Sequence, residues 1–275
     1  MITIGKINTL KVASRVGAEI YLGSKASTNV FLVDKKQPEN CQIGDELTVF
    51  VYVDTEGHLA ATTTIPKALV DEIAWLNVVS VNRVGAFLDW GLPKDLLVPF
   101  GEQHHEMEVG NSYLVKLFLD SQNRILATTK IAKHIADESV YFKVGQKVSL
   151  LIADKTDLGI KAIVNHSHWG MLYPNELFQP VHKGQKLDGY IKQIREDHKI
   201  DLSLYQPGYG KVDELTDKIL AALQANQGFL ALSDKSPPEA MYDTFGVSKK
   251  VYKQAIGALY KNKRILIEKN GIKLI

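Results

Sequence analysis

The sequence contains an internal repeat, and this repeat restricts the possible folds more than any other feature. Segment 51–63 (VYVDTEGHLAATT) aligns with segment 117–129 (LFLDSQNRILATT) at an offset of 66 residues. Upstream, Gly17-Ala18 matches Gly85-Ala86 at an offset of 68, so the copies differ by only two residues of loop length. A weaker third copy covers 184–204. We therefore expect three copies of one structural unit, each of roughly 65–75 residues.

Each copy is rich in segments that are typical of short β-strands. Segments 47–53 and 113–119 combine β-branched and aromatic residues, and turn residues at 55–57 and 121–123 follow them. About five such strands in about 70 residues match a small OB-fold barrel, because closure removes the unpaired edges of a short sheet. The sequence predicts a mainly β protein with three such barrels in tandem.

After Pro207 the apolar periodicity changes to that of helices. Apolar residues recur every three or four positions in 212–223 and again in 251–259. Ser236-Pro237-Pro238-Glu239 predicts a helix start that combines a capping box with proline in the first turn. Gly246 is expected to end that helix, and Ser248 to cap the next one.

The last eleven residues predict a β-hairpin. Two apolar segments flank Asn270-Gly271, and Asn-Gly is the strongest short-range hairpin signal. Three helices followed by a hairpin are typical of a winged helix. We therefore divide the chain into four domains, with short helices expected at the two joints 66–73 and 131–140. The predicted barrels cover 1–66, 67–138 and 139–207, and the winged helix covers 208–275.

Composition excludes several classes of protein. Apolar residues make up 45% and charged residues 23% of the chain, which is ordinary for a folded protein and argues against disorder. No apolar run approaches the length of a membrane-spanning helix, and Lys6 and Lys11 interrupt any signal-peptide core. The single cysteine, Cys41, excludes an internal disulfide and a multi-cysteine metal site. We expect a cytoplasmic protein.

Charge is distributed unevenly along the chain. The net charge is only +2, but segment 248–275 holds eight basic residues and one acidic residue. This excess favours contact with phosphates over a merely solubilising surface, although both interpretations are open. Lysine rather than arginine dominates the segment, so base-specific bidentate contacts are not expected.

Several motifs resemble a known family. Gly85-Ala86-Phe87-Leu88-Asp89 is similar to the second strand region of S1-type RNA-binding domains, and segments 170–177 and 199–204 resemble the third strand and the end of such domains. Segments 85–103 and 192–201 look like the conserved virulence factor B family, also called YitL-like, and this resemblance covers essentially the whole chain. It implies three S1-like OB-fold barrels followed by a winged helix. It also implies an RNA-binding, regulatory and non-catalytic bacterial protein.

The repeats depart from the S1 pattern at specific positions. Only the second repeat keeps the aromatic residue, Phe87, because Glu19 and Lys161 stand at the equivalent positions of the other two. The usual histidine after the third strand is replaced by Pro99 in the second repeat and by Tyr173 in the third. We therefore expect the barrels to have divided into binding and scaffolding roles.

Binding of single-stranded nucleic acid requires rings on which bases can stack and cations that neutralise phosphates. One face of an OB barrel can present both kinds of side chain, since alternate residues of a strand point outward. For each aromatic candidate the alternative is that the ring packs beneath a neighbouring loop or domain, and for Trp90 this alternative is favoured. The candidate RNA-binding residues are Tyr21, Lys35, Phe87, Trp90, Lys161, His168, Tyr173, Lys192, Arg195, Lys250, Lys253, Lys261, Lys269 and Lys273.

Signals for an enzyme are poor. Segment 102–108 (EQHHEME) collects potential metal ligands, but adjacent histidines on a turn do not easily bind one metal, and the metalloprotease spacing is missing. No phosphate-binding loop and no serine nucleophile elbow occur in the sequence. We expect no catalytic residues, metal or cofactor, and neither a membrane nor a small-molecule substrate as partner.

These observations predict a non-catalytic protein that holds single-stranded RNA on S1-like barrels, with a basic winged helix assisting. A post-transcriptional regulator is the expected role. One alternative is a transcription regulator that binds duplex DNA through the winged helix. Another is an interaction scaffold on the ribosome or an RNA-processing assembly.

Overall fold

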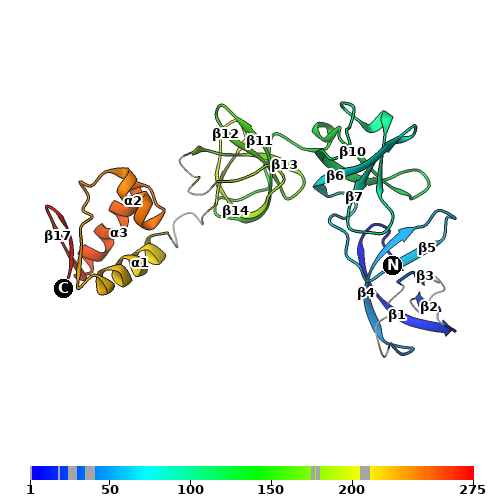
Figure 1. Cartoon of the computed structure of the whole chain (residues 1–275), viewed down its shortest axis with the longest axis horizontal. Helices are drawn as coiled ribbons and strands as arrows, with labels where there is room; N and C mark the ends of the chain where they lie inside the picture. Colours follow the sequence, from blue (N-terminus) through cyan, green and yellow to red (C-terminus); the bar gives the residue numbers. More distant parts are fainter. Residues whose placement is uncertain are drawn as a thin grey trace. The chain divides into compact units, whose positions relative to one another are not determined.

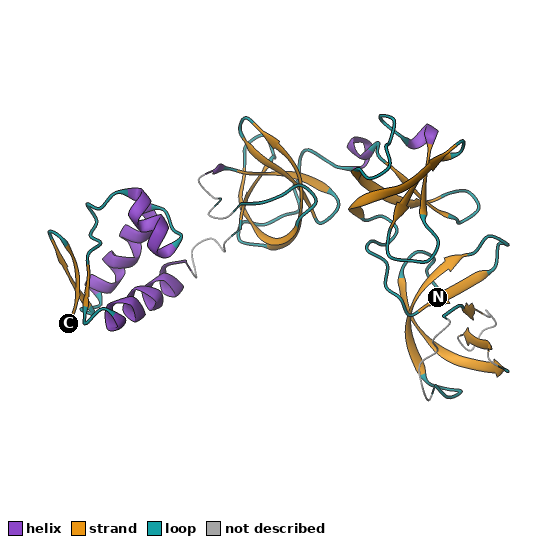
Figure 2. Cartoon of the chain, in the orientation of Figure 1, coloured by secondary structure: helices purple, strands orange, loops and turns teal. Residues whose placement is uncertain are grey.

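A computed structural model describes most of the 275 residues. Its described residues are 2–17, 19–23, 30–34, 41–174, 177, 180–204 and 211–275, with the backbone alone at 211–214. The chain forms two compact units, which we call the N-terminal unit (Met1–Ile135) and the C-terminal unit (Ala136–Ile275). Strands dominate the first three domains, and the α-helices gather in the last one (Figure 2).

The first barrel is closed and lies in the N-terminal unit (Figure 1). Its strands are joined in the order β1-β2-β3-β5-β4, and the parallel pair β3–β5 closes it. Its core is apolar and includes the buried thiol of Cys41. The five strands are β1 (Ile7–Val16), β2 (Glu19–Gly23), β3 (Val30–Leu32), β4 (Glu46–Val53) and β5 (Leu59–Thr62).

The second barrel has the same five strands but is not closed by backbone pairing. Its strand order is β10-β9-β6-β7-β8, so β8 and β10 lie beside each other without the parallel ladder found in the first barrel. The 3-10 helix η1 (Phe100–Glu102) follows β8, and the amide of Thr129 donates to the Glu102 carbonyl at 3.0 Å. The strands are β6 (Ile73–Asn82), β7 (Gly85–Asp89), β8 (Leu96–Pro99), β9 (Ser112–Leu119) and β10 (Ile125–Thr128).

The joint between these two barrels is a packed linker, so the helix predicted at 66–73 was wrong. Asp71 adopts a φ of 69°, which ends any helix there, and its amide donates to the Leu117 carbonyl at 2.9 Å. Ala68 and Val70 are buried. Tertiary contacts outweigh local helix propensity in this segment, because the linker forms part of the core shared by both barrels.

The third barrel is closed and has the topology of the first. Its strand order is β11-β12-β13-β15-β14, and β13 and β15 form the parallel pair. In the preceding joint only η2 (Ile131–His134) is helical, whereas Ala136 continues extended and pairs with His168. The strands are β11 (Lys147–Thr156), β12 (Gly159–Val164), β13 (His168–Leu172), β14 (Lys186–Ile194) and β15 (Ile200–Ser203).

The last domain is a winged helix. Apolar residues of all three helices and of the sheet form one core, with Tyr252 fully buried at its centre. The Tyr252 hydroxyl donates to the Leu232 carbonyl at 2.9 Å, and burial raises the pKa of this phenol. The elements are α1 (Lys211–Ala225), β16 (Phe229–Leu230), α2 (Pro238–Phe245), α3 (Lys249–Lys261), β17 (Ile265–Glu268) and β18 (Gly271–Leu274).

Most of the predicted helix boundaries in this domain are confirmed. Gly246 ends α2 with a φ of 68°, and the Ser248 side chain accepts the amide of Val251 at the start of α3. The predicted capping box was wrong, because Pro237 occupies the cap position and the Ser236 hydroxyl accepts the Ser233 amide instead. Within the described part of the chain, no helix is both long and apolar enough to cross a membrane.

Candidate nucleic-acid interface

One face of the third barrel combines aromatic rings with cations. Lys161 on β12 pairs with Met171 on β13. Trp169 and Tyr173 lie two residues before and after Met171, so they share the face of the sheet that carries Lys161. The Lys161 ammonium lies 4.0 Å from the centre of the Trp169 ring. Both side chains are half-buried, which leaves part of this cation–π pair open to a ligand.

A second ring and cation lie next to this pair. The Arg195 guanidinium lies 5.5 Å from the centre of the Tyr173 ring, and its Nε donates to a carboxylate oxygen of Asp201 at 2.8 Å. The ion pair with Asp201 fixes the guanidinium beside the ring. We call Lys161, Trp169, Tyr173 and Arg195 the third-barrel face. The sequence predicted Lys161, Tyr173 and Arg195 as binding candidates, and it suggested Trp169 as a neighbour on the same surface, with partial burial of this ring as the alternative.

His168 does not belong to the third-barrel face. It precedes Trp169 on β13 and therefore points to the other side of the strand, where its ring contacts Phe142 edge-on at 5.1 Å. Its Nδ1 lies 2.8 Å from the Ser167 hydroxyl, and burial lowers the pKa of the imidazole below its usual value. At neutral pH this ring is therefore mainly uncharged, and we remove it from the cationic candidates.

Lys192 occupies an irregular position on β14. The pairing of β14 with β15 shifts between Ile191 and Gln193, which leaves the half-buried Lys192 at a bulge. Bulges redirect a side chain relative to the regular alternation of a strand. Lys192 remains a candidate by its charge alone.

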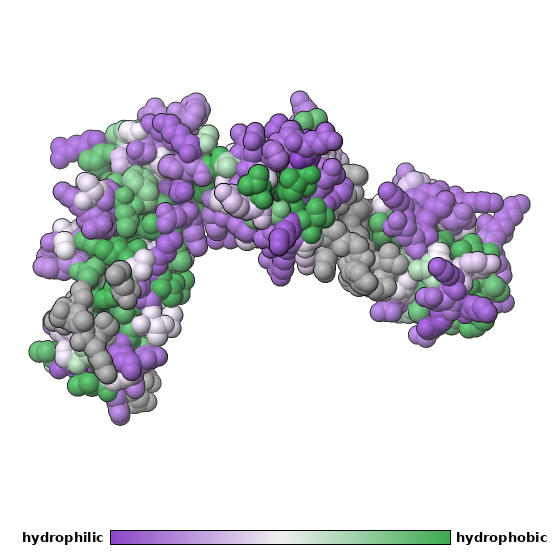
Figure 3. Space-filling model, turned by 180° about the vertical axis from the view of Figure 1, so that it is seen from behind, coloured by the Kyte–Doolittle hydropathy of each residue, from purple (hydrophilic) through white to green (hydrophobic). Residues whose placement is uncertain are grey.

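The winged helix presents a row of exposed lysines. Lys250, Lys253 and Lys261 are exposed on α3, and their spacing places them on one side of the helix. Lys269 and Lys273 are exposed on the hairpin formed by β17 and β18. We call these five residues the C-terminal lysines. On the face seen in Figure 3 hydrophilic residues dominate this domain.

Exposed aromatic rings accompany these lysines, and they were not among the residues predicted to bind RNA. Tyr260 follows Lys253 by seven residues on α3 and is 56% exposed. Phe229 on β16 pairs with Lys273 and is 39% exposed. A search for aromatic residues at helical spacing from the lysines would have found Tyr260. Phe229 lies beside Lys273 only because β16 and β18, which are distant in sequence, pair with each other.

The first barrel is less well equipped for nucleic acid. The Tyr21 hydroxyl donates to the Glu19 carboxylate at 2.8 Å, and this hydrogen bond raises the pKa of the phenol. The Tyr21 ring also contacts Phe31 of the neighbouring strand, with 5.7 Å between ring centres. The adjacent carboxylate would repel a phosphate at this ring. Lys35, the cation predicted beside it, lies outside the described residues.

Trp90 lies in the core between the first two barrels. It is only 6% exposed, and its ring meets Phe50 of the first barrel edge-on with 5.7 Å between centres. The indole Nε1 donates to the Lys94 carbonyl at 2.6 Å. The ring is thus packed beneath neighbouring residues, the alternative favoured for Trp90, and Trp90 is not a stacking residue. Burial leaves too little of the ring for a base to stack on.

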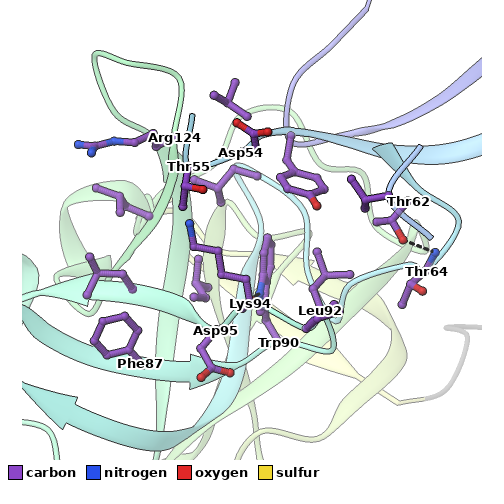
Figure 4. Close-up of a pocket in the computed structure, with 18 of the residues that line it drawn as sticks. Asp54, Thr55, Thr62, Thr64, Phe87, Trp90, Leu92, Lys94, Asp95 and Arg124 are labelled. Carbon is purple, nitrogen blue, oxygen red and sulfur yellow. Dashed lines mark hydrogen bonds between the residues drawn. The ribbon is translucent and has the colours of Figure 1, made fainter. Parts of the chain in front are cut away.

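Phe87 lines a groove between the first and second barrels. Ala86 and Leu88 on either side of it are buried in the barrel core, so the half-buried Phe87 ring points outward, as predicted. The groove has a volume of about 1210 Å³. Figure 4 shows Arg124, Thr55 and Asp54 at one end, Thr62 and Thr64 at the other, and Lys94 between them. The sequence identified only Phe87 and Trp90 of this groove, because its walls come from two domains.

The candidate metal ligands of segment 102–108 do not gather into a site in the structure. His104 and His105 are exposed, with 4.3 Å between ring centres. Among the described residues, no group of three or more histidine, cysteine, aspartate or glutamate side chains could hold a metal ion.

Family models match three of the four domains. A model of the S1 domain matches residues 4–64 and 72–130, which are the first and second barrels. A model of the CvfB-like winged helix domain matches residues 217–274. The third barrel lies between the matched regions, and its topology repeats that of the first.

Relatives extend over the full set of domains. YitL of Bacillus subtilis is 28% identical over 267 residues, covering 91% of this chain and 87% of that protein. Conserved virulence factor B of Staphylococcus saprophyticus is 28% identical over 283 residues, covering 98% and 94% respectively. A crystal structure of a multidomain protein with nucleic acid binding domains from Streptococcus pneumoniae matches with a TM-score of 0.40 and 24% identity, covering 99% of this chain and 98% of that one.

Proposed function

We propose, from the premise that this chain belongs to the conserved virulence factor B family, that it binds single-stranded RNA as a post-transcriptional regulator. The third-barrel face and the C-terminal lysines would make the contacts. Binding alone, without covalent chemistry, would then control access to a transcript.

The observation that carries this proposal is the pairing of each ring on the third-barrel face with a cation. Trp169 lies beside Lys161, and Tyr173 lies beside Arg195. A base that stacks on one of these rings brings its phosphate within reach of the adjacent cation. Base stacking on aromatic side chains is worth about 1–3 kcal/mol per base and tolerates any sequence.

The C-terminal lysines would add an electrostatic contribution. Lysine ammonium groups neutralise phosphates as point charges, so the affinity should fall steeply with salt. A log–log slope of about −0.7 per phosphate contact is expected for a single strand. The exposed Tyr260 and Phe229 beside these lysines offer further stacking surface.

One observation favours duplex DNA as a second candidate ligand. Lys250, Lys253 and Lys261 line one side of α3, the helix that many winged helices insert into a groove of the duplex. The rings of the third-barrel face offer nothing to a duplex, since its bases are already stacked. We therefore rank duplex DNA below single-stranded RNA.

Fluorescence anisotropy with the full chain tests the proposal. The probes are a 20-nucleotide poly-uridine RNA and a duplex DNA of equal length at low salt. We expect tighter binding of the RNA, and about a tenfold loss of RNA affinity for Tyr173→Ala, since about 1.4 kcal/mol of stacking is removed. Tyr141→Ala, which changes an exposed tyrosine of the same unit outside the third-barrel face, is the matched control.

Two outcomes would contradict the proposal. Tighter binding of the duplex would assign the winged helix to DNA. Failure to bind either probe at low salt would favour a scaffold that contacts only proteins.

A further inference from the structure

The groove between the first two barrels has a rigid frame. The core of the second barrel includes Phe50 of the first, and the Lys67 amide donates to the Trp90 carbonyl at 2.8 Å. Gly5 and Val70 also join the barrels, because the Val70 amide donates to the Gly5 carbonyl at 3.0 Å. A binding site built on such a frame is preformed, which reduces the conformational entropy lost when a ligand binds.

The groove is large and partly apolar. Its volume of about 1210 Å³ exceeds the roughly 300–1,000 Å³ typical of small-molecule pockets, so it has room for a ligand larger than a typical small molecule. Eight mainly apolar side chains in its wall are half-buried rather than fully buried, with Val53, Pro99 and Leu126 among them. The other five are Tyr52, Phe87, Leu92, Leu97 and Ile125. On the face of the N-terminal unit seen in Figure 3, hydrophobic residues reach the surface over both barrels.

The charges in the groove disfavour a nucleic acid. Three carboxylates line it, those of Asp34, Asp54 and Asp95. Amide hydrogen bonds, chiefly from His58, hold the pKa of Asp54 below its usual value, so this carboxylate stays ionised. A phosphate chain passing through the groove would be repelled by all three groups.

The cations of the groove do not compensate for these carboxylates. Among the described residues that line the groove, only Lys94 and Arg124 are cationic, and the Arg124 guanidinium is 2.7 Å from the Asp120 carboxylate. The N-terminal unit as a whole has 13 basic and 15 acidic residues. The net charge of this unit is therefore slightly negative and does not oppose a cationic ligand.

We propose that this groove binds an extended peptide segment of a protein partner, with apolar side chains that contact Phe87 and its neighbours and with lysine or arginine residues that face the carboxylates. The partner is recognised by that alternation of apolar and basic residues. This assignment does not depend on RNA binding, because it concerns a different unit of the chain and a ligand of opposite charge. Phe87 thereby becomes a contact for peptide rather than for a base.

Anisotropy with three fluorescein-labelled ten-residue peptides tests the groove in the full chain. The peptides alternate leucine with lysine, leucine with glutamate, or serine with lysine. We expect the leucine–lysine peptide to bind tightest, since it alone satisfies both the apolar wall and the carboxylates. Equal binding of the leucine–glutamate peptide would overturn the proposal.

Two variants locate the binding to the groove. Asp95→Lys reverses an exposed charge in the wall and should weaken leucine–lysine peptide binding about fivefold to tenfold, with the fold unchanged. Phe87→Ala should weaken it by a similar factor. Glu106→Lys makes the same charge change at an exposed site of the N-terminal unit that is not among the groove residues, and should have less than a twofold effect. Equal effects of Asp95→Lys and Glu106→Lys would contradict the proposal.

The same variants separate peptide from RNA. If RNA passed through the groove, Asp95→Lys would remove repulsion and raise the affinity for poly-uridine RNA more than Glu106→Lys does. We expect both variants to bind the RNA equally well. A selective gain for Asp95→Lys would assign the groove to RNA and overturn the peptide assignment, whereas the absence of RNA binding by any variant would affect only the proposed function.

Discussion

The second and third barrels share one architecture but present opposite surfaces. Gly85 and Gly159 begin the second strand of each, with φ values of 154° and 155°, and in both a Cβ atom would collide with the carbonyl of the facing strand. Two residues later the chain has Phe87 in one barrel and Lys161 in the other. Phe87 lines an acidic groove made with the first barrel, whereas Lys161 lies over Trp169.

This difference shows which residues of the barrel are free to change. The glycine that begins the strand cannot change, because two strands approach closely there. The inward-pointing residues of the strand cannot change freely either, because they fill the barrel core. The outward-pointing residue affects neither the strand contact nor the core, so it can differ between barrels and each barrel can bind its own ligand. The consequence for this chain is a division in which the N-terminal unit offers an apolar, acidic groove and the C-terminal unit offers rings and lysines.

The largest expected effect comes from breaking the rigid pairing of the first two barrels. In Gly5→Ala the new Cβ would lie 2.1 Å from a methyl of Val70, at a φ of 74° that L residues avoid. We expect the N-terminal unit to lose about 2–4 kcal/mol of unfolding free energy, measured by urea denaturation. Leucine–lysine peptide binding should weaken in parallel, since the groove depends on this pairing.

A matched control isolates the contact from the backbone conformation. Gly17 has a φ of 61°, but a Cβ there would meet nothing within 4 Å. Gly17→Ala should lower the unfolding free energy by only about 1–2 kcal/mol and leave leucine–lysine peptide binding unchanged. Equal losses for the two variants would mean that the contact between Gly5 and Val70 does not hold the barrels together.

The next effect tests whether the basic character of the C-terminal unit is functional. The triple variant of Lys250, Lys253 and Lys261 to alanine removes three exposed cations from α3. We expect the log–log salt slope of RNA binding to decrease by about 2 and the affinity at about 0.1 M salt to fall at least tenfold. Anisotropy titrations at several salt concentrations measure both quantities.

A triple variant of the N-terminal unit controls for net charge. Lys11, Arg83 and Lys133 are exposed, and their replacement by alanine removes the same total charge. This variant should leave the salt slope of RNA binding unchanged. If both triple variants lowered the slope equally, the two units would not differ in their contact with phosphates.

The smallest effect concerns His168 in the third barrel. Burial lowers the pKa of its imidazole, so the unfolded chain takes up this proton at a higher pH than the folded chain. The wild type should therefore lose stability as the pH falls through about 6.5 toward the folded-state pKa, and His168→Gln should lose less. Urea midpoints at about pH 7.5 and 5.5 measure this difference.

His182→Gln provides the matched control for this last measurement, because His182 is an exposed histidine of the same barrel. Its pH-dependent loss of stability should remain that of the wild type. A wild-type-like loss in His168→Gln would mean that burial of His168 does not govern the pH response of the third barrel.

Much of the fold could be predicted from local patterns. The repeat, the position of β4 and β9, the end of α2 at Gly246 and the hairpin at Asn270-Gly271 follow from residues close together in sequence. The linker at 66–73 could not be predicted, since Asp71 adopts its φ in response to a hydrogen bond with Leu117, 46 residues later. Burial of Trp90 beneath a neighbouring loop or domain was favoured from its sequence context, but its partner Phe50, from another barrel, could not be identified from local residues.

The sequence by itself determined the number of barrels, the winged helix and the excess of lysine near the C-terminus, because strand alternation, helical spacing and turn residues act over a few positions. Tertiary structure alone decided which rings lie beside which charges. The cations of Lys161 and Arg195 reach Trp169 and Tyr173 through strand register, and the carboxylates of Asp34 and Asp95 face one groove through the packing of two domains. Contacts of this kind depend on the folded arrangement of distant segments, and no local pattern specifies them.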